Sequence, residues 1–457
     1  MKKKVAIVGA GLCGSLLALR LAQLGYQIDV FEKRPDLRKV TLDAGRSINL
    51  ALSDRGLKGL RLVGLEDAAK AISIPMHGRM IHPKGAETYF MKYSGRETDY
   101  INSISRPGLN AMLLDEAEKT GNIKLHFNQS CKNVLFEDHK IQLQDVNGNI
   151  SYYDYDLVFG TDGAGSAVRT SMSKRSSSLR FNFSQQYLDT GYKELEIPAG
   201  ENGSFRIEKN ALHIWPRDGF MMIALPNLNG SFTVTLFFPF TGSNSFEYLG
   251  QDDEKIVQFF NTHFPSAVPH MPDLVEDYHQ NPSSSLGTIK CFPWSVDRRS
   301  LIMGDAAHAV VPFYGQGMNA SFEDVTVLDE LMAKHGEDWD SIITEYDDKR
   351  KPDADAIGDL AVDNFYEMRD ATKDPVFGRK RALELQLENL YPDYYAKYSL
   401  VTFNEDISYH EAMTQGRFQD EVLMNFARGI DDISKVDISK VKAMMDEKLK
   451  EFKAQKP

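Results

Sequence analysis

The sequence has little cysteine, little tryptophan and a deficit of basic side chains. Among its 457 residues only Cys13, Cys131 and Cys291 carry thiols, too few and too scattered for a disulfide framework or a zinc site. The 65 acidic and 53 basic side chains leave a net charge of −12, which argues against nucleic acid and anionic membrane surfaces as partners. The histidines show no HExxH spacing, and no GxSxG motif indicates a hydrolase. We therefore expect a cytoplasmic protein without a metal.

Long uninterrupted hydrophobic runs are also missing. Residues 1–19 begin like a signal peptide, with lysines before an apolar stretch, but three glycines interrupt that stretch. Residues 219–246 carry no charge and are long enough to span a bilayer. Prolines, asparagines and a glycine divide them into 220–225 and 231–238, which favours two strands joined by a turn.

The N-terminal segment follows the pattern strand, glycine turn, helix, strand. In the turn, Gly9 permits a tight bend, Gly11 lets the backbone approach a pyrophosphate, and Gly14 lets helix and strand pack closely. The following helix presents free N–H groups to phosphates, and Glu32 at the end of the next strand can accept hydrogen bonds from a ribose. This pattern predicts an adenine dinucleotide site, without distinguishing FAD from NAD.

Three later motifs add to this turn. Strands end in acidic turns at 157–163 (LVFGTDG) and 300–305 (SLIMGD), where each Asp alone could be an ordinary helix cap. Residues 315–320 (GQGMNA) also match a nucleotide-binding glycine pattern, but Pro312 precedes them where a strand would be needed. We therefore expect a helix N-terminus there, whose partial positive charge can stabilise an anion on a bound ring.

In this order, the first glycine turn and the two acidic turns resemble the fingerprints of the single-component FAD-dependent aromatic hydroxylases, the para-hydroxybenzoate hydroxylase-like family. The resemblance implies FAD as cofactor and NADPH as a co-substrate that has no domain of its own. It implies that Asp305 holds the flavin ribityl chain and that Asp162 shapes the channel used by FAD and NADPH. The cofactor-binding residues that it implies are Gly9, Gly11, Gly14, Glu32, Arg34, Ala51, Arg106, Asp162, Gly304, Asp305, Gly317, Met318 and Asn319.

The predicted fold class is α/β, with a Rossmann-like FAD-binding domain, an antiparallel-sheet substrate domain and a helical C-terminal region. Aromatic-rich strand patterns between about 180 and 295 indicate the second of these, and helical patterns dominate after Asn319. The predicted domains are 1–180 (FAD-binding, first part, with a substrate-contacting insert at about 70–105), 181–295 (substrate), 296–375 (FAD-binding, second part) and 376–457 (helical).

Longer blocks narrow the resemblance to the members of this family that hydroxylate L-kynurenine in tryptophan catabolism. These blocks are 45–53 (GRSINLALS), 78–82 (GRMIH), 191–195 (GYKEL), 212–216 (LHIWP), 221–227 (MMIALPN), 311–319 (VPFYGQGMN) and 398–403 (YSLVTF). They imply that Arg79 and Tyr93 bind the substrate carboxylate and that Asn364 and Tyr398 complete that pocket. Glu367 would orient the pocket, and a slot for the aromatic ring would be lined by Ile223, Leu225, Phe237, Phe313 and Met368.

The implied reaction is ring hydroxylation by O₂ through a flavin C4a-hydroperoxide, with no catalytic side chain named. His308 lies near the flavin by motif, where a structural role is favoured over a catalytic one. The members with a mitochondrial location carry a C-terminal membrane anchor, and no comparably apolar segment follows residue 415, so we expect no transmembrane anchor. A hydroxylase of another anthranilate-like acid and a non-catalytic FAD-binding redox module are the alternatives. The oligomeric state stays open, with a homodimer as one option.

Overall fold

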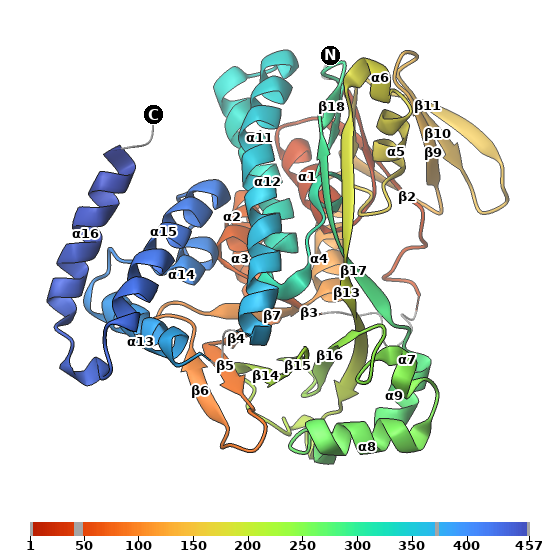
Figure 1. Cartoon of the computed structure of the whole chain (residues 1–457). Helices are drawn as coiled ribbons and strands as arrows, with labels where there is room; N and C mark the ends of the chain where they lie inside the picture. Colours follow the sequence, from red (N-terminus) through yellow and green to blue (C-terminus); the bar gives the residue numbers. More distant parts are fainter. Residues whose placement is uncertain (1–2, 41–48, 371–373, 455–457) are drawn as a thin grey trace.

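The computed structural model describes residues 3–40, 49–370 and 374–454, and a mainly parallel sheet forms the upper right part of the molecule in Figure 1. Its six strands follow the order β18-β19-β12-β1-β2-β8, all parallel except β18. The bounds are β1 Lys4–Val8, β2 Gln27–Glu32, β8 Ile123–Phe127, β12 Leu157–Gly160, β18 Ser295–Val296 and β19 Ser300–Ile302. Strands β1 and β12 are almost continuous runs of buried residues, as parallel strands covered on both faces require.

Helices and two small antiparallel sheets surround this sheet. Helix α1 packs against α4 and α11, and α11 in turn packs against α2 and α12. The helices are α1 Leu12–Gln23, α2 Asp54–Leu62, α3 Glu66–Ala71, α4 Arg106–Lys119, α5 Ala167–Ser173, α6 Ser176–Leu179, α10 Asp305–His308, α11 Gly317–His335 and α12 Trp339–Asp370. The small sheets are β3 Asn49–Leu52, β7 Ile101–Ser105 and β4 Ser73–Met76, and β11 Ile150–Asp154, β10 Lys140–Gln144 and β9 Ser130–Leu135, each in that spatial order.

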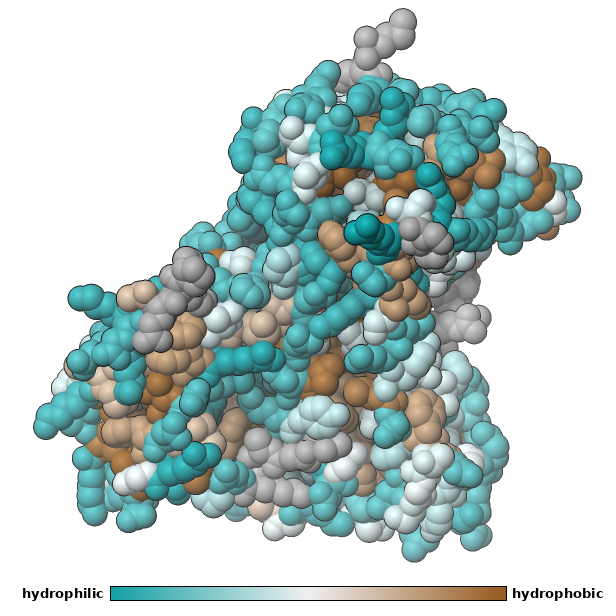
Figure 2. Space-filling view, turned by 45° about the horizontal axis from the view of Figure 1, so that its top comes forward, coloured by the Kyte–Doolittle hydropathy of each residue, from teal (hydrophilic) through white to brown (hydrophobic). Residues whose placement is uncertain are grey.

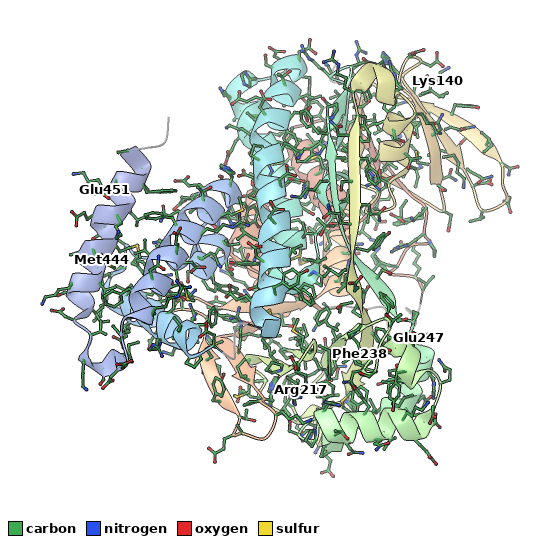
Figure 3. The ribbon with its side chains drawn as sticks, in the orientation of Figure 1. Lys140, Arg217, Phe238, Glu247, Met444 and Glu451 are labelled. Atoms are coloured by element: carbon green, nitrogen blue, oxygen red, sulfur yellow. The ribbon has the colours of Figure 1, made fainter. Side chains whose placement is uncertain are left out.

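A seven-stranded sheet forms the lower part of the molecule (Figure 1), in the order β17-β13-β16-β15-β14-β5-β6. Neighbouring strands are antiparallel except for the parallel pair β14 and β5. The bounds are β5 Gly78–Ile81, β6 Tyr89–Lys92, β13 Asn182–Ile197, β14 Ala211–Arg217, β15 Phe220–Pro226, β16 Phe232–Pro239 and β17 Ser284–Phe292. Helices α7 Phe246–Leu249, α8 Asp253–His263 and α9 Leu274–Gln280 share a hydrophobic core with one face of the sheet, and Phe238, labelled in Figure 3, belongs to that core.

Four helices follow at the C-terminal side: α13 Pro375–Leu390, α14 Lys397–Thr402, α15 Tyr409–Arg428 and α16 Ile438–Ala454. Val441 and Met445 of α16 are buried against α13 and α15, while Glu451 is exposed, so this helix packs through one face (Figures 1 and 3). The face of the molecule in Figure 2 is mainly hydrophilic with separate brown patches. Within the described ranges, no helix combines the length and the apolar character that a membrane crossing needs.

The predicted fold class is confirmed, and the structure adds details that the sequence patterns miss. The uncharged stretch 219–246 does form two strands, β15 and β16. Helix α11 begins at Gly317, within the third glycine motif and two residues before Asn319. The parallel pairing of β5 with β14 was not predicted, because neither strand carries a local signal for a partner so distant in sequence. Residues 45–48 of the first long block lie outside the described residues, and the domain boundaries stay a prediction.

Candidate active site

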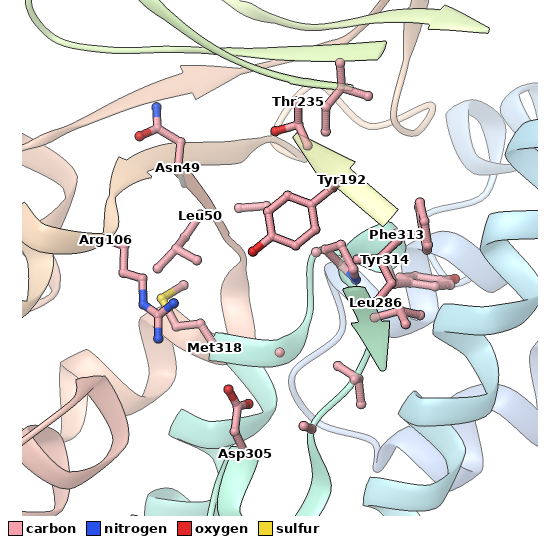
Figure 4. A pocket seen from close by; sticks show the side chains of 18 of the residues that line it. Asn49, Leu50, Arg106, Tyr192, Thr235, Leu286, Asp305, Phe313, Tyr314 and Met318 are labelled. Carbon is pink, nitrogen blue, oxygen red and sulfur yellow. The ribbon is translucent and has the colours of Figure 1, made fainter. Parts of the chain in front are cut away.

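A cavity of about 640 Å³ lies where the two large sheets meet, and Figure 4 shows part of its lining. This volume lies within the usual range of small-molecule sites. The turn after β1, strand β3 and the segment from α10 to α11 line one end. The other end is lined by the seven-stranded sheet, Met368 of α12 and Tyr398 of α14. The two ends differ in their chemistry and are described separately.

The glycine turn has the backbone geometry that the sequence predicts. Gly9 has φ +104°, and a Cβ there would lie 2.6 Å from the Thr161 carbonyl oxygen. A Cβ on Gly14 would lie 2.1 Å from the Gly9 carbonyl oxygen, so this glycine is required where α1 packs on the turn. Gly11 lines the cavity, and a Cβ on it would meet no described atom within 4 Å. The Glu32 carboxylate closes the turn by accepting hydrogen bonds from the N–H groups of Ala10 and Arg34, both at 2.9 Å.

The second acidic turn also faces the cavity. Asp305 lies in the cavity wall together with Arg106 (Figure 4), and burial raises the pKa of the Asp305 carboxyl. The preceding Gly304 donates its N–H to the buried Asp324 carboxylate at 2.7 Å. Asp305 is therefore a partly exposed polar group in the cavity wall, at the position where the resemblance implies a ribityl hydroxyl.

The third motif presents a helix N-terminus to the cavity. Gly317 and Met318 line it, and no side chain of the described ranges caps the start of α11. The Asn319 side chain fixes this turn: its Oδ1 accepts the Ser53 N–H at 3.0 Å, and its Nδ2 donates to the Ala51 and Gly315 carbonyls at 2.8 and 2.9 Å. A phosphate turn, an acidic side chain and an open helix N-terminus along one wall would together hold FAD, with its pyrophosphate at the glycine turn.

Not every predicted cofactor residue lines the cavity. The Asp162 carboxylate accepts the N–H groups of Ala167 and Val168 at 2.6 and 3.3 Å, which is the helix-cap geometry, while its other oxygen is buried with no partner in the described part of the chain. The predicted cofactor residues that are not among the lining residues are Gly9, Gly14, Glu32, Arg34, Asp162, Gly304 and Asn319. For most of these, the contacts above shape the turns that do reach the cavity.

The opposite end of the cavity holds a cation beside two stacked aromatic rings. The Arg79 guanidinium lies 5.2 Å from the centre of the Tyr93 ring and 4.5 Å from that of Tyr398, and these two rings stack at 5.8 Å. The Arg79 Nε and the Tyr93 hydroxyl are buried with no hydrogen-bond partner among the described residues. Burial raises the pKa of the Tyr93 phenol, so the hydroxyl stays protonated and can donate. Two unpaired buried donors beside a positive charge favour an anionic ligand.

An apolar slot lies between the two ends and follows from the two-residue period of the strands. Met221, Ile223 and Leu225 of β15 and Thr233, Thr235 and Phe237 of β16 face the cavity, whereas Met222, Ala224, Val234 and Leu236 between them enter the core with α8 and α9. Phe237 packs on Phe313 at 4.8 Å between ring centres. The predicted ring-slot residues Ile223, Leu225, Phe237, Phe313 and Met368 thus lie together on the lining.

Asn364 and Glu367 stand behind the lining instead of on it. Asn364 donates its amide to the Phe313 carbonyl at 2.6 Å, so it supports the slot from outside. Glu367 forms an ion pair with Lys397, the neighbour of Tyr398, at 3.1 Å. Both residues lie on α12 with Met368, but their polar groups point toward other partners.

Sequence reasoning missed a buried charge network under the cofactor end. His308 lies 2.7 Å from Asp324, whose carboxylate also binds Arg350 at 2.8 Å; Arg350 and Arg55 share Glu323. Burial disfavours the charged form of Asp324, but His308 and Arg350 outweigh it and lower its pKa to about 2. His308 therefore has a structural partner, as the sequence favoured. Isolated charged residues in helices gave no local signal for this network.

Tyr192 was also overlooked, although a signal existed. It lies directly opposite Phe237 in the pairing of β13 with β16, and its ring projects into the cavity in Figure 4. The two-residue period would have placed it on the cavity face, because residues opposite each other in neighbouring strands share a face.

Comparisons with known proteins agree with this geometry. The sequence model of the FAD binding domain family matches residues 2–361. The chain is 44% identical over 453 residues to the kynurenine 3-monooxygenase of Myxococcus xanthus, covering 99% of this chain and 96% of that one. It is 46% identical over 423 residues to the same enzyme of Flavobacterium johnsoniae, covering 92% and 93%. It is 45% identical over 453 residues to that of Dictyostelium discoideum, covering 96% of each.

Solved structures share the fold at lower identity. 2-Methyl-3-hydroxypyridine-5-carboxylic acid oxygenase superposes with a TM-score of 0.65 at 18% identity, over 85% of this chain and 98% of the other. A probable FAD-dependent monooxygenase from Pseudomonas aeruginosa gives 0.63 at 18% identity, over 80% and 97%. From the family match and the near full-length identities, the chain belongs to the FAD binding domain family and, within it, to the kynurenine 3-monooxygenases.

Proposed function

We propose that the protein is an FAD-dependent monooxygenase that converts L-kynurenine to 3-hydroxykynurenine, with O₂ and NADPH as co-substrates. The observation that carries this proposal is the arrangement of Arg79 and Tyr93, whose buried unpaired donors lie across an apolar slot from the FAD-binding wall. L-Kynurenine has an amino-acid head and an anthraniloyl ring, which match the two parts of this cavity in order.

The carboxylate end accounts for binding. A guanidinium can pair with both oxygens of a carboxylate, and a hydrogen bond to a charged group contributes about 1.5–3 kcal/mol. The Tyr93 hydroxyl supplies a further donor, and the Tyr398 ring, which stacks on Tyr93, lies 4.5 Å from the guanidinium and helps to keep it in place. Binding the head here directs the ring into the slot toward the cofactor wall.

The apolar slot accounts for the transfer of oxygen to the aromatic ring. FAD held along that wall would supply the electron transfer from NADPH and the activation of O₂ that put one oxygen atom on the ring and release the other as water. Ile223, Leu225, Phe237 and Phe313 surround the ring position with apolar groups and limit the access of water. The aniline nitrogen makes the neighbouring ring carbon electron-rich, so no side chain need remove a proton before the oxygen is transferred. The α11 N-terminus supplies partial positive charge at the cofactor end.

The test is NADPH oxidation by the FAD-loaded protein with and without L-kynurenine, with the product identified by mass spectrometry under ¹⁸O₂. We expect kynurenine to accelerate the oxidation and one labelled oxygen to enter 3-hydroxykynurenine. Faster turnover of another anthranilate-like acid would identify that acid as the substrate in place of L-kynurenine. FAD binding without any substrate-stimulated NADPH oxidation would favour the non-catalytic redox module.

We further propose the cytoplasm as the compartment and a homodimer as the assembly. The three cysteines are buried and unpaired, which suits a reducing environment. Cell fractionation and light scattering test the two proposals, and a monomer at micromolar concentration would contradict the second.

A further inference from the structure

The two tyrosines at the carboxylate end come from distant parts of the chain. Tyr93 follows β6 and Tyr398 belongs to α14, yet their rings stack at 5.8 Å with Arg79 over both. Among the described residues, no hydrogen bond joins either tyrosine hydroxyl to the other segment and sets this spacing. The spacing must therefore come from the backbone segments that carry the rings.

One buried carboxylate joins those two segments. Glu388 of α13 is 1% exposed, and its two oxygens accept different backbone N–H groups: Oε2 from Gly95 at 3.1 Å and Oε1 from Ala396 at 3.0 Å. Gly95 follows Tyr93 by two residues, and Ala396 precedes Tyr398 by two residues. A single side chain thus fixes both segments, each at a point two residues in sequence from its tyrosine.

Packing around Glu388 strengthens this link. A Cβ on Gly95 would lie 2.4 Å from the Asn389 nitrogen and 2.5 Å from the Leu385 carbonyl oxygen, so the Tyr93 segment rests directly on the backbone of α13. Arg96 donates to the Tyr394 carbonyl at 2.8 Å, and its guanidinium lies 3.9 Å from the Tyr395 ring centre. The two segments also contact each other here, which leaves little freedom for either to shift alone.

We propose that Glu388 is a positioning residue for substrate binding: it holds Tyr93 and Tyr398 at the spacing that lets them and Arg79 grip the substrate carboxylate. The proposal rests on the proposed function and deepens it, because it assigns a role to a residue that touches neither substrate nor cofactor. Its specific consequence is that loss of the Glu388 link weakens ligands that have the amino-acid head more than ligands that lack it.

The experiment compares Glu388→Gln with the wild-type holoenzyme. Glutamine has one acceptor oxygen and places a donor at the other position, so one of the two backbone N–H groups loses its partner. Dissociation constants of L-kynurenine and of 2-aminoacetophenone, which keeps the ring and ketone but lacks the head, are measured from the absorption change of bound FAD. We expect the affinity for kynurenine to fall about tenfold and the affinity for 2-aminoacetophenone to change little. The KM for kynurenine should rise while kcat is nearly retained.

Asp353→Asn is the matched control. Asp353 is also a buried carboxylate, 8% exposed, that accepts a backbone N–H, that of His410 at 2.9 Å, but it lies away from the carboxylate end. This variant should keep the ratio of the two dissociation constants. An unchanged ratio in Glu388→Gln, or an equal loss for both ligands, overturns the proposal.

Two further arms keep the test decisive. If Glu388→Gln does not retain FAD, Gly95→Ala replaces it, because the added methyl group moves the Tyr93 segment from α13 without removing a charge; an unchanged ratio there overturns the proposal as well. If the wild-type protein binds kynurenine but does not consume NADPH, the proposed function is refuted. The ratio of the two dissociation constants still tests the role of Glu388 in that case.

Discussion

Arg79 is the residue whose removal should affect substrate binding most. Its guanidinium lies beside the stacked Tyr93 and Tyr398 rings, and its Nε is buried with no partner among the described residues, so Nε can donate to a ligand. Arg79→Ala removes a charged pair of hydrogen bonds worth about 3 kcal/mol in total, which corresponds to a roughly 150-fold rise in the dissociation constant for L-kynurenine. Because the head is gripped in the same way throughout the reaction, kcat should fall much less than KM rises.

The assay is a titration of the holoenzyme with L-kynurenine and 2-aminoacetophenone, followed by steady-state NADPH oxidation. Arg61→Ala is the control, since Arg61 is half exposed, pairs with Glu66 and Glu405 on the surface, and should change binding by less than about 0.5 kcal/mol. If Arg79→Ala loses the same affinity for both ligands, or keeps its affinity for kynurenine, the assignment of Arg79 to the substrate carboxylate is refuted.

Three further perturbations address other parts of the structure. Tyr93→Phe deletes the unpaired hydroxyl but keeps the ring stack, so KM for kynurenine should rise roughly tenfold at a nearly constant kcat in steady-state assays; an unchanged KM would contradict donation by this hydroxyl. Gly14→Ala places a methyl group 2.1 Å from the Gly9 carbonyl oxygen, so the purified protein should lose bound FAD, measured as the flavin-to-protein absorbance ratio, and full retention would contradict the packing role. Asp324→Asn removes a carboxyl whose pKa is lowered in the folded state from 3.8 to about 2, a stabilisation present above pH 3.8 and lost as pH falls toward 2; urea unfolding should show a deficit at pH 7 that shrinks over that range, and a deficit independent of pH would argue against it.

Local backbone requirements made part of the fold predictable. Gly9 and Gly14 are demanded by contacts with Thr161 and with the turn itself, so their spacing predicts the turn wherever a strand and a helix flank it. The two-residue period of β15 and β16 likewise separates the cavity face, with Ile223 and Phe237, from the core face.

Other features depend on partners that no local pattern reveals. The parallel pairing of β5 with β14, which brings Arg79 beside Leu212, joins segments with no shared signal. Asn364 was expected to complete the carboxylate pocket, but its amide instead donates to the Phe313 carbonyl. Buried charges such as Asp324 and Glu388 resemble surface residues until their partners are known. The resemblance to known hydroxylases supplied Arg79 and Tyr93, which composition and periodicity alone would not have selected.

The length of β13 has a consequence for how substrate preference can change. At about 3.3 Å per residue, its 16 residues extend for roughly 50 Å, pairing with β17 along one stretch and with β16 along the next (Figure 1). This one strand runs through both halves of the molecule. The distance between the carboxylate-binding end of the cavity and the cofactor wall is therefore set by the backbone. A change of preference to a longer or shorter aromatic acid therefore requires substitutions of side chains that face the cavity. A hinge motion that changes the distance between the two halves is not available.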